Sequence, residues 1–400
     1  MKFSILRKYQ DHILQMGALG FNLAFIMIVA YFLPMEVFGA FTYQYALASI
    51  LAVICKFGLD SVFLYYYPRL GFKHTLSKTS VMFLVLAILF MSIGVQIPML
   101  TLPIIFLAVV IAFDEILLAI QRAQYETSAF LGLRNFLLMS RIIVFVIFQD
   151  IPLLILCLVS QGISVFVFAL FNIKRFKKAN VKDEITRKEL DQASLSERLN
   201  FAIKNVISNL MGVLNVKSDI IMIGILLSFE HVGVYEIGAR WGFLAFIPIT
   251  IFSAVNASRI SRLSKRKTLK FFDVYYQDSR KKVFLITTVY TMILVVAQQM
   301  IGLFPDYFDA KLLDVGIILA LGFSFSSFFG PSGTALVMLG YPGAHLARIF
   351  IALVVNVLLN LYLIPIYGAI GAAFATAAVV GMSGLASYLI LRRVILKNLQ

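Results

Sequence analysis

Apolar runs of spanning length recur along the whole chain, separated by short polar stretches. An α-helix needs about 20 apolar residues to cross the hydrocarbon core of a bilayer, whereas a barrel strand needs about 10. We therefore predict helices, and we place about twelve of them. They are His12–Leu33, Phe38–Phe57, Ser77–Ile97, Leu102–Ile120, Phe130–Phe148, Pro152–Ile173, Phe201–Phe229, Val232–Val255, Val283–Phe304, Leu312–Leu339, Ala344–Ile366 and Ile370–Leu391.

The composition agrees with lipid as the main solvent of these helices. The chain is 61% apolar and 14% charged, whereas soluble domains average about 25% charged residues. The first apolar run has spanning length and lacks a small-x-small cleavage site, so we expect an uncleaved first helix rather than a signal peptide. Both cysteines lie inside apolar runs, and neither a disulfide framework nor a metal or cofactor motif is expected.

Basic residues alternate between the predicted connections, which orients the chain in the membrane. Most of the 35 Lys and Arg precede the first helix, follow the second, sixth and eighth, or close the chain. The other connections carry mainly Asp and Glu. By the positive-inside rule the basic side is cytoplasmic, so both termini are predicted there. The net charge of +15 is therefore an orientation signal with a contribution to anionic lipid contact, and not a nucleic-acid footprint.

A long polar stretch of mixed charge, Lys174–Asn200, divides the chain near its middle. It predicts an N-terminal six-helix lobe (1–175), a cytoplasmic linker (176–200) and a C-terminal six-helix lobe (201–400). Glu36–Phe41 and Glu230–Tyr235 open the second and eighth helices with Gly and an aromatic residue at one shared offset. Such a pattern favours a parallel internal repeat, in which two lobes enclose a central cavity.

The seventh predicted helix carries the most polar face. Ser208, Gly212, Asn215 and Asp219 follow helical spacing along one stripe, with Lys217 beside it. In one interpretation the stripe is a cavity wall, where Asp219 binds a proton or cation and Lys217 contacts an anion. In the other, Lys217 extends to the interface and Asp219 pairs with a basic side chain. The sequence leaves both open.

Other charges within the predicted helices are candidates for anion binding, because ionisable groups in spans usually face a bundle interior or cavity. Glu236 and Arg240 are four residues apart and can pair on one helix face. A guanidinium also matches phosphate oxygens geometrically, so Arg240 is the preferred candidate of the two. Arg141 lies deep in the fifth helix, where a cavity position and an interfacial position both remain open.

Two features of the last quarter of the chain concern helix shape and packing. Pro331, among small residues, predicts a kink in the tenth helix, as a hinge or as a static bend. Arg348, Ala352, Asn356 and Asn360 form a stripe on the eleventh helix. Asparagines in such a position hydrogen-bond neighbouring helices more often than they bind substrate.

The motifs of this region resemble one transporter family. Asn356, Leu359-Asn360, Leu363-Ile364-Pro365-Ile366-Tyr367-Gly368 and Gly371-Ala372-Ala373, followed by Ala375-Thr376, resemble the bacterial polysaccharide-repeat (O-antigen or capsule, Wzx-type) flippases of the MOP exporter superfamily. Lys217–Gly224 with Val232–Tyr235 looks like the seventh and eighth helices of the same family. The resemblance covers most of the chain and is best in its second half.

What the resemblance implies is a flippase in the bacterial inner membrane. It would move an undecaprenyl-diphosphate-linked oligosaccharide from the cytoplasmic to the periplasmic leaflet by alternating access, with Arg141, Lys217 and Arg240 as cationic substrate contacts. A drug or cation antiporter of the same superfamily is the alternative, and a membrane polymerase or ligase of the glycan pathway is weaker. The predicted periplasmic connections are too short for the long external loop of such enzymes.

The sequence also bears on the energy source. It contains no Gly-rich phosphate loop followed by Lys-Ser/Thr, so direct ATP hydrolysis is not expected. A proton or sodium gradient is the natural source, unless consumption of the substrate outside draws the flow. Asp219 is the predicted coupling residue, because it lies in the polar stripe one turn from Asn215.

The predicted topology can be tested by cysteine labelling. In a background without Cys55 and Cys157, Lys182→Cys should react with an impermeant maleimide only after the cytoplasmic side is opened. Asp309→Cys should react in intact cells, because its connection is predicted to be external. Labelling of position 182 from outside would contradict the topology.

Overall fold

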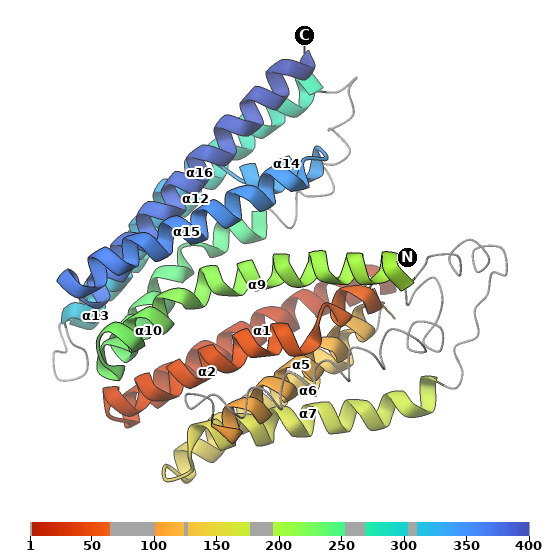
Figure 1. Cartoon of the computed structure of the whole chain (residues 1–400), viewed down its shortest axis with the longest axis vertical. Helices are drawn as coiled ribbons and strands as arrows, with labels where there is room; N and C mark the ends of the chain where they lie inside the picture. Colours follow the sequence, from red (N-terminus) through yellow and green to blue (C-terminus); the bar gives the residue numbers. More distant parts are fainter. Residues whose placement is uncertain are drawn as a thin grey trace. The chain divides into compact units, whose positions relative to one another are not determined.

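The structure, a computed structural model of the chain, describes residues 2–64, 101–123, 127–176, 195–252, 269–302 and 310–399. Regular secondary structure in these ranges is helical (Figure 1). The helices are α1 Lys2–Phe32, α2 Met35–Lys56, α5 Leu102–Ala123, α6 Thr127–Ile147, α7 Leu153–Phe176, α9 Leu195–Leu226, α10 Phe229–Leu244, α12 Leu269–Gly302, α13 Ala310–Ser327, α14 Ser332–Met338, α15 Pro342–Tyr367 and α16 Ala369–Leu399. The predicted helix over 77–97 and residues 177–194 of the predicted linker lie outside the described residues.

Seven helices within the described ranges are long and apolar enough to cross a bilayer, and α13 with α14 adds an eighth if the bent pair is one span. The apolar parts of α1 and α7, Gly17–Phe32 and Leu153–Phe168, are shorter. Large apolar side chains also remain exposed on the helices. Leu285, Val289 and Val296 of α12 are examples. An exposed apolar face on a long helix is typical of contact with lipid, where the hydrogen bonds of the backbone are satisfied internally.

Two prolines shape the helices. α13 and α14 meet at an angle of 45°, at the Gly330-Pro331 pair, which confirms the predicted kink. The predicted single helix Val232–Val255 is wrong, because α10 ends at Leu244 and a separate helical segment follows at 247–252. Pro248 has no N–H to donate to the Leu244 carbonyl, and its ring clashes with the preceding turn, so the helix breaks there.

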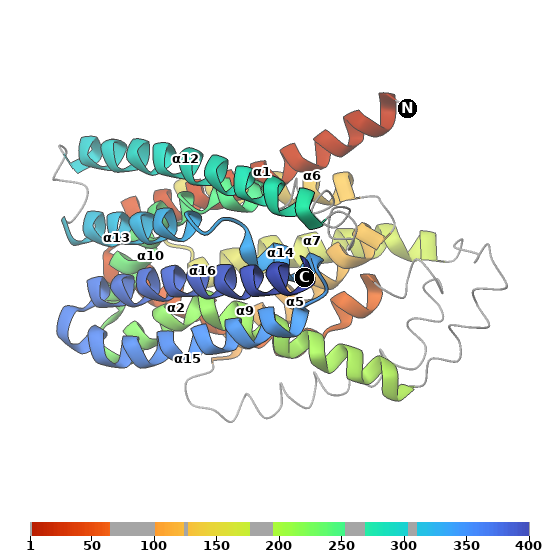
Figure 2. The same cartoon turned by 90° about the horizontal axis from the view of Figure 1, so that it is seen from above.

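The chain forms two compact units: residues 1–32 with 44–213, and residues 33–43 with 214–400. The division falls inside α2 and inside α9, so the first turns of α2 belong with the second unit. The predicted lobe boundaries at 175 and 201 stay a prediction. Within the second unit, α15 and α16 lie side by side (Figure 2), and α13 packs on α10, α12 and α16.

The packing supports the predicted repeat. Counted along the chain, α5, α6 and α7 of the first half correspond to α13 with α14, α15 and α16 of the second. α5 packs on α7 as α13 packs on α16, and α6 packs on α7 as α15 packs on α16. Two helix pairs of the first half therefore have counterparts in the second.

The two glycines that the repeat aligns, Gly39 of α2 and Gly233 of α10, lie against each other. A Cβ atom on Gly39 would stand 1.7 Å from the carbonyl oxygen of Phe229 and 2.8 Å from the amide nitrogen of Gly233. A Cβ on Gly233 would stand 2.6 Å from the carbonyl oxygen of Met35. Both positions must be glycine because the two backbones touch, as in close helix contacts within membranes.

Gly39→Ala should therefore destabilise the protein, because the added methyl group meets backbone atoms that cannot rotate away. Overpacking of this kind costs about 1–3 kcal/mol. The control is Gly162→Ala in α7, where nothing lies within 4 Å of the new Cβ and where alanine favours the helix by roughly 0.5–1 kcal/mol. Thermal unfolding in detergent should show a lower Tm for Gly39→Ala alone. Equal Tm values for both variants would contradict the contact.

Candidate functional site

The side chain of Asp219, on α9, is enclosed by three other helices of the second unit and is 2% exposed. Its Oδ1 accepts hydrogen bonds from Nδ2 of Asn356 (2.9 Å) and of Asn360 (2.6 Å), both on α15. Its Oδ2 accepts from the hydroxyls of Tyr235 on α10 (2.5 Å) and Thr376 on α16 (2.6 Å). We call Asp219 with these four donors the Asp219 network.

The motif at the end of α15 explains how the network is assembled. Asn356 and Asn360 are one turn apart, so both amides lie on one face of α15. The chain then reverses at Gly368, whose φ of 62° favours glycine. Gly371 lies so close to α15 that a Cβ there would stand 2.2 Å from the carbonyl oxygen of Leu363. This tight reversal brings Thr376 opposite Asn360.

The network decides between the two interpretations of Asp219. All four donors are uncharged, and Asp219 makes no ion pair within the part of the chain that the structure describes. The interpretation in which Asp219 pairs with a basic side chain is therefore wrong. The expected role of the asparagines as partners of a neighbouring helix is confirmed. Asn215, one turn before Asp219, also faces α15, where its Nδ2 lies 3.4 Å from the carbonyl oxygen of Ile349.

The network has unused capacity to bind. Oδ1 of Asn360 is buried without a hydrogen-bond partner, although buried acceptors are normally satisfied. The network also contains carboxylate, amide and hydroxyl oxygens, which are the kinds of oxygen that suit a proton or a small hard cation.

The charges of the candidates Lys217 and Arg240 both act on Glu236 in the second unit. Nε of Arg240 donates to Oε1 of Glu236 at 2.7 Å, and the second guanidinium nitrogen lies 2.5 Å from the same oxygen. Lys217 is near enough for its charge to act on Glu236 as well. The predicted pairing of Glu236 with Arg240 is confirmed. Two bases share one acid, so one positive charge is left uncompensated within this group.

Arg141 lies inside the first unit and is 5% exposed. Its Nε and one terminal nitrogen donate to the hydroxyl of Ser160 on α7, at 2.9 Å and 2.6 Å. Its guanidinium also lies over the ring of Phe25 on α1, 5.3 Å from the centroid. Of the two positions left open for this residue, the interfacial one is wrong, because the side chain is held by three helices of the unit.

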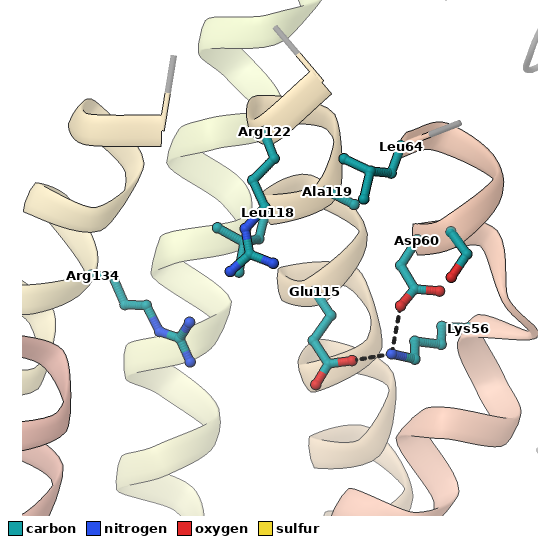
Figure 3. Close-up of a pocket in the computed structure, with 9 residues that line it drawn as sticks. Lys56, Asp60, Leu64, Glu115, Leu118, Ala119, Arg122 and Arg134 are labelled. Atoms are coloured by element: carbon teal, nitrogen blue, oxygen red, sulfur yellow. Dashed lines mark hydrogen bonds and ion pairs between the residues drawn. The ribbon is translucent and has the colours of Figure 1, made fainter. Parts of the chain in front are cut away.

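A further charged pocket in the first unit was not predicted from the sequence. Lys56, at the end of α2, is buried between Asp60 (2.8 Å) and Glu115 of α5 (2.5 Å), as Figure 3 shows. Arg122 and Arg134 also line this pocket of about 290 Å³. Lys56 and Asp60 are four residues apart, which is the signal that sequence reasoning missed. Asp114, next to Glu115 in the sequence, points elsewhere and accepts a hydrogen bond from Ser164 of α7.

Comparison with known proteins gives related sequence over part of the chain. A segment of 184 residues is 30% identical to the probable low-salt glycan biosynthesis flippase Agl15 of Haloferax volcanii. The match covers 44% of this chain and 38% of that relative, so the chain aligns with less than half of the length of the relative. No protein-family profile matches the chain.

Comparison with solved structures gives the fold of the whole chain. A multidrug-resistance MATE transporter of the MOP superfamily, in an inward-facing conformation, superposes with a TM-score of 0.69 and 16% identity over 96% of this chain and 95% of that one. Lipid II flippase MurJ, in an inward closed conformation, superposes with a TM-score of 0.67 and 16% identity, over 97% of this chain and 89% of MurJ. A MOP-superfamily transporter from Pyrococcus furiosus superposes with a TM-score of 0.59 and 15% identity, over 99% of this chain and 96% of that one.

These likenesses confirm an all-α, multi-pass membrane fold of the MOP-transporter type. Every protein named in the comparisons is a transporter or flippase and not an enzyme, in agreement with the expectation from the sequence. The number of twelve helices and their grouping into two six-helix lobes stay predictions. The chain therefore has the same fold as these solved transporters.

Proposed function

We propose that this chain is a flippase that moves an undecaprenyl-diphosphate-linked oligosaccharide repeat unit from the cytoplasmic to the periplasmic leaflet by alternating access. The observation that carries the proposal is the set of cations within the long helices, Arg141, Lys217 and Arg240, in a transporter fold whose sequence relative is a glycan biosynthesis flippase. A diphosphate needs cationic contacts on its path, whereas its polyprenyl tail can remain in lipid.

The three cations are suited to this role in different ways. Arg240 is paired with Glu236 but is 36% exposed, so its outer donors remain accessible. Lys217 adds a second charge to the same acid. Arg141 donates to a neutral hydroxyl and lies over an aromatic face, and its charge also acts on the carboxylate of Asp114. The outer donors of Arg240 can therefore contact an anion while its pair with Glu236 remains in place.

The proposed location is the bacterial inner membrane, with both termini in the cytoplasm. The alternation of basic and acidic connections supports this orientation. Exposed apolar side chains along α12 and the other long helices support a multi-pass position in lipid. The partners that follow are the polyprenyl-linked glycan, membrane lipid and a coupling ion, without nucleic acid.

A second candidate function is drug or cation antiport. The buried carboxylate of Asp219 favours it, because an antiporter of this superfamily needs an acidic group, and a MATE multidrug transporter shares the fold. The net positive charge of the Lys217, Glu236 and Arg240 group favours an anionic substrate instead. We therefore place flipping of an anionic lipid-linked glycan first. No described feature favours the polymerase or ligase alternative.

Asp219 is the proposed site of energy coupling. Its carboxylate is held by α10, α15 and α16 through neutral donors, so a proton or sodium ion bound there changes the net charge of the network. A change of charge in a buried site alters the hydrogen bonds that tie these helices together. A gradient of that ion can then drive the conformational cycle.

Arg240→Ala should strongly reduce glycan export without lowering the amount of protein, because the phosphate contact is lost while Glu236 remains near Lys217. Arg240→Lys should keep part of the activity, since it retains the charge but not the bidentate geometry. Surface glycan and membrane protein level should be measured in the same cells. Lys282→Ala is the control, because Lys282 is an exposed base paired with Asp278. Normal export by Arg240→Ala would rule out this contact.

Asp219→Asn should remove the response of transport to an ion gradient, because a neutral amide cannot exchange a proton or balance a cation. Transport should be measured in proteoliposomes with imposed proton and sodium gradients, tested separately. Thr376→Val is the companion variant: it removes one donor to the carboxylate and leaves the charge, so its response to the gradient should persist. Stimulation of Asp219→Asn to the same extent as the parent protein would show that coupling occurs elsewhere.

A further inference from the structure

The second unit contains a pocket of about 280 Å³ that the function proposed above does not use. Its lining comes from α13, α14, α15, α16 and the segment after α10. It lies next to the apolar cluster in which α14 packs against the start of α12 and the end of α16. This is the end of the unit that the predicted topology places toward the cytoplasm.

The lining of the pocket is cationic and rich in hydroxyls. Arg348 and His345 of α15 provide the bases, and no acidic residue is among the described residues that line it. The hydroxyls are those of Ser326, Ser332, Thr334, Ser383 and Ser387. We call this the Arg348 pocket.

The guanidinium of Arg348 is not fully satisfied in this pocket. One terminal nitrogen donates to the hydroxyl of Ser383, and the other lies 3.4 Å from Nδ1 of His345. Its Nε is buried and has no hydrogen-bond partner. A charged donor without an acceptor is costly when removed from water. The charge of Arg348 therefore lacks an acidic counterpart among the described residues, and an anion is the group that would provide one.

The first unit shows what a compensated version of this pocket looks like. The pocket of Figure 3 is lined by the end of α2, the last turns of α5 and the start of α6, which correspond along the chain to part of the lining of the Arg348 pocket; α7, the counterpart of α16, is not among its lining. Arg134 lies early in α6, as Arg348 lies early in α15, and Arg134 pairs with Asp114 at 3.9 Å. Lys56 is likewise held between two acids. Lys56 and Arg134 thus have acidic partners within the first unit, whereas Arg348 has none among the described residues that line its pocket.

The position of Arg348 in its helix strengthens this contrast. The span within α15 begins at Gly343, so Arg348 lies more than one turn inside it. A charge in a span costs about 2.5–3.5 kcal/mol on insertion scales and marks a functional site by default. Arginine with surrounding hydroxyl donors suits the tetrahedral oxygens of a phosphate better than a single carboxylate, because several donors converge from different directions.

We infer that the Arg348 pocket binds the phosphate group of a membrane lipid. The phosphate belongs either to the diphosphate of a polyprenyl-linked glycan or to the headgroup of an anionic phospholipid. The first source rests on the function proposed above, and the second does not. Arg348 holds the phosphate oxygens through Nε and a terminal nitrogen, and the hydroxyls of Ser383 and Ser387 lie among the remaining donors.

The test measures lipid binding to the purified full chain by native mass spectrometry. The two probes are farnesyl diphosphate and dioleoylphosphatidylglycerol, each titrated separately and then in competition. Arg348→Ala should weaken binding of the preferred probe about tenfold or more, because one charged hydrogen-bonding group is lost. Arg348→Lys should recover part of it. Ser383→Asp should weaken binding to a similar degree, because it supplies the internal carboxylate that Asp114 supplies to Arg134.

Arg134→Ala is the matched control, since it removes an arginine of equivalent position that is already paired, and binding should stay at the parental level. Thermal unfolding of each variant verifies the fold, and Ser383→Asp should be at least as stable as the parent because it gives Arg348 a partner. Preference for farnesyl diphosphate identifies the substrate headgroup as the occupant, and preference for phosphatidylglycerol identifies a phospholipid. Parental binding of both probes by Arg348→Ala and Ser383→Asp would overturn the inference.

The outcome is separable from that for the proposed function. If binding depends on Arg348 but the parent protein exports no glycan, phosphate binding by the Arg348 pocket is supported and the flippase function is contradicted. If the parent protein and Arg348→Ala export glycan and bind the probes equally well, phosphate binding by the Arg348 pocket is contradicted and the flippase function is supported.

Discussion

The second unit depends on a carboxylate that is fully enclosed by protein. A buried carboxylate is tolerated only if its lone pairs are satisfied, and Asp219 meets this condition through four donors on three other helices. Because the donors are neutral, the net charge of the network stays negative when Asp219 is ionised. The packing of α9 against α10, α15 and α16 is thereby tied to the charge state of one side chain, which is the property that ion coupling requires.

The two halves share two corresponding helix pairs but distribute charge differently. At the offset that aligns Gly39 with Gly233, the position equivalent to Asp219 is Phe25, over whose ring Arg141 lies. One half therefore buries an anion where the other buries an aromatic ring under a cation. The first half closes its ion pairs internally at Lys56 and Arg134, whereas the second leaves Arg348 without an acid. Symmetry of the backbone thus coexists with a specialised chemistry in each half.

Close backbone contact is what allows the helices to hold these groups in place. Apolar side chains gain little from contacting each other rather than lipid, so helices in a bilayer associate where small residues let them approach. Gly39 and Gly233 join the start of α2 to α10, and Gly371 joins α16 to α15. The second of these contacts places Thr376 within reach of Asp219, so the glycines of the motif serve the polar network directly.

The sequence alone determined where most of the described helices lie and which groups required explanation. It did so because a helix that crosses the bilayer must satisfy its backbone hydrogen bonds internally over a fixed thickness. Such a helix appears in the sequence as a long apolar run. The kink at Pro331 and the helix-contacting role of Asn356 and Asn360 followed from the same local chemistry. The break before Pro248 was missed, although its cause is also local.

Only the tertiary structure decided the partners of those groups. Helical spacing shows which residues share a face, but it does not fix the rotation of that face toward a neighbour or the register between two helices. For this reason Asp219 was found among neutral donors rather than beside a base, and Arg141 within the first unit rather than at an interface. For the same reason the burial of Lys56 and the unpaired Nε of Arg348 became visible only when helices distant in sequence were packed together.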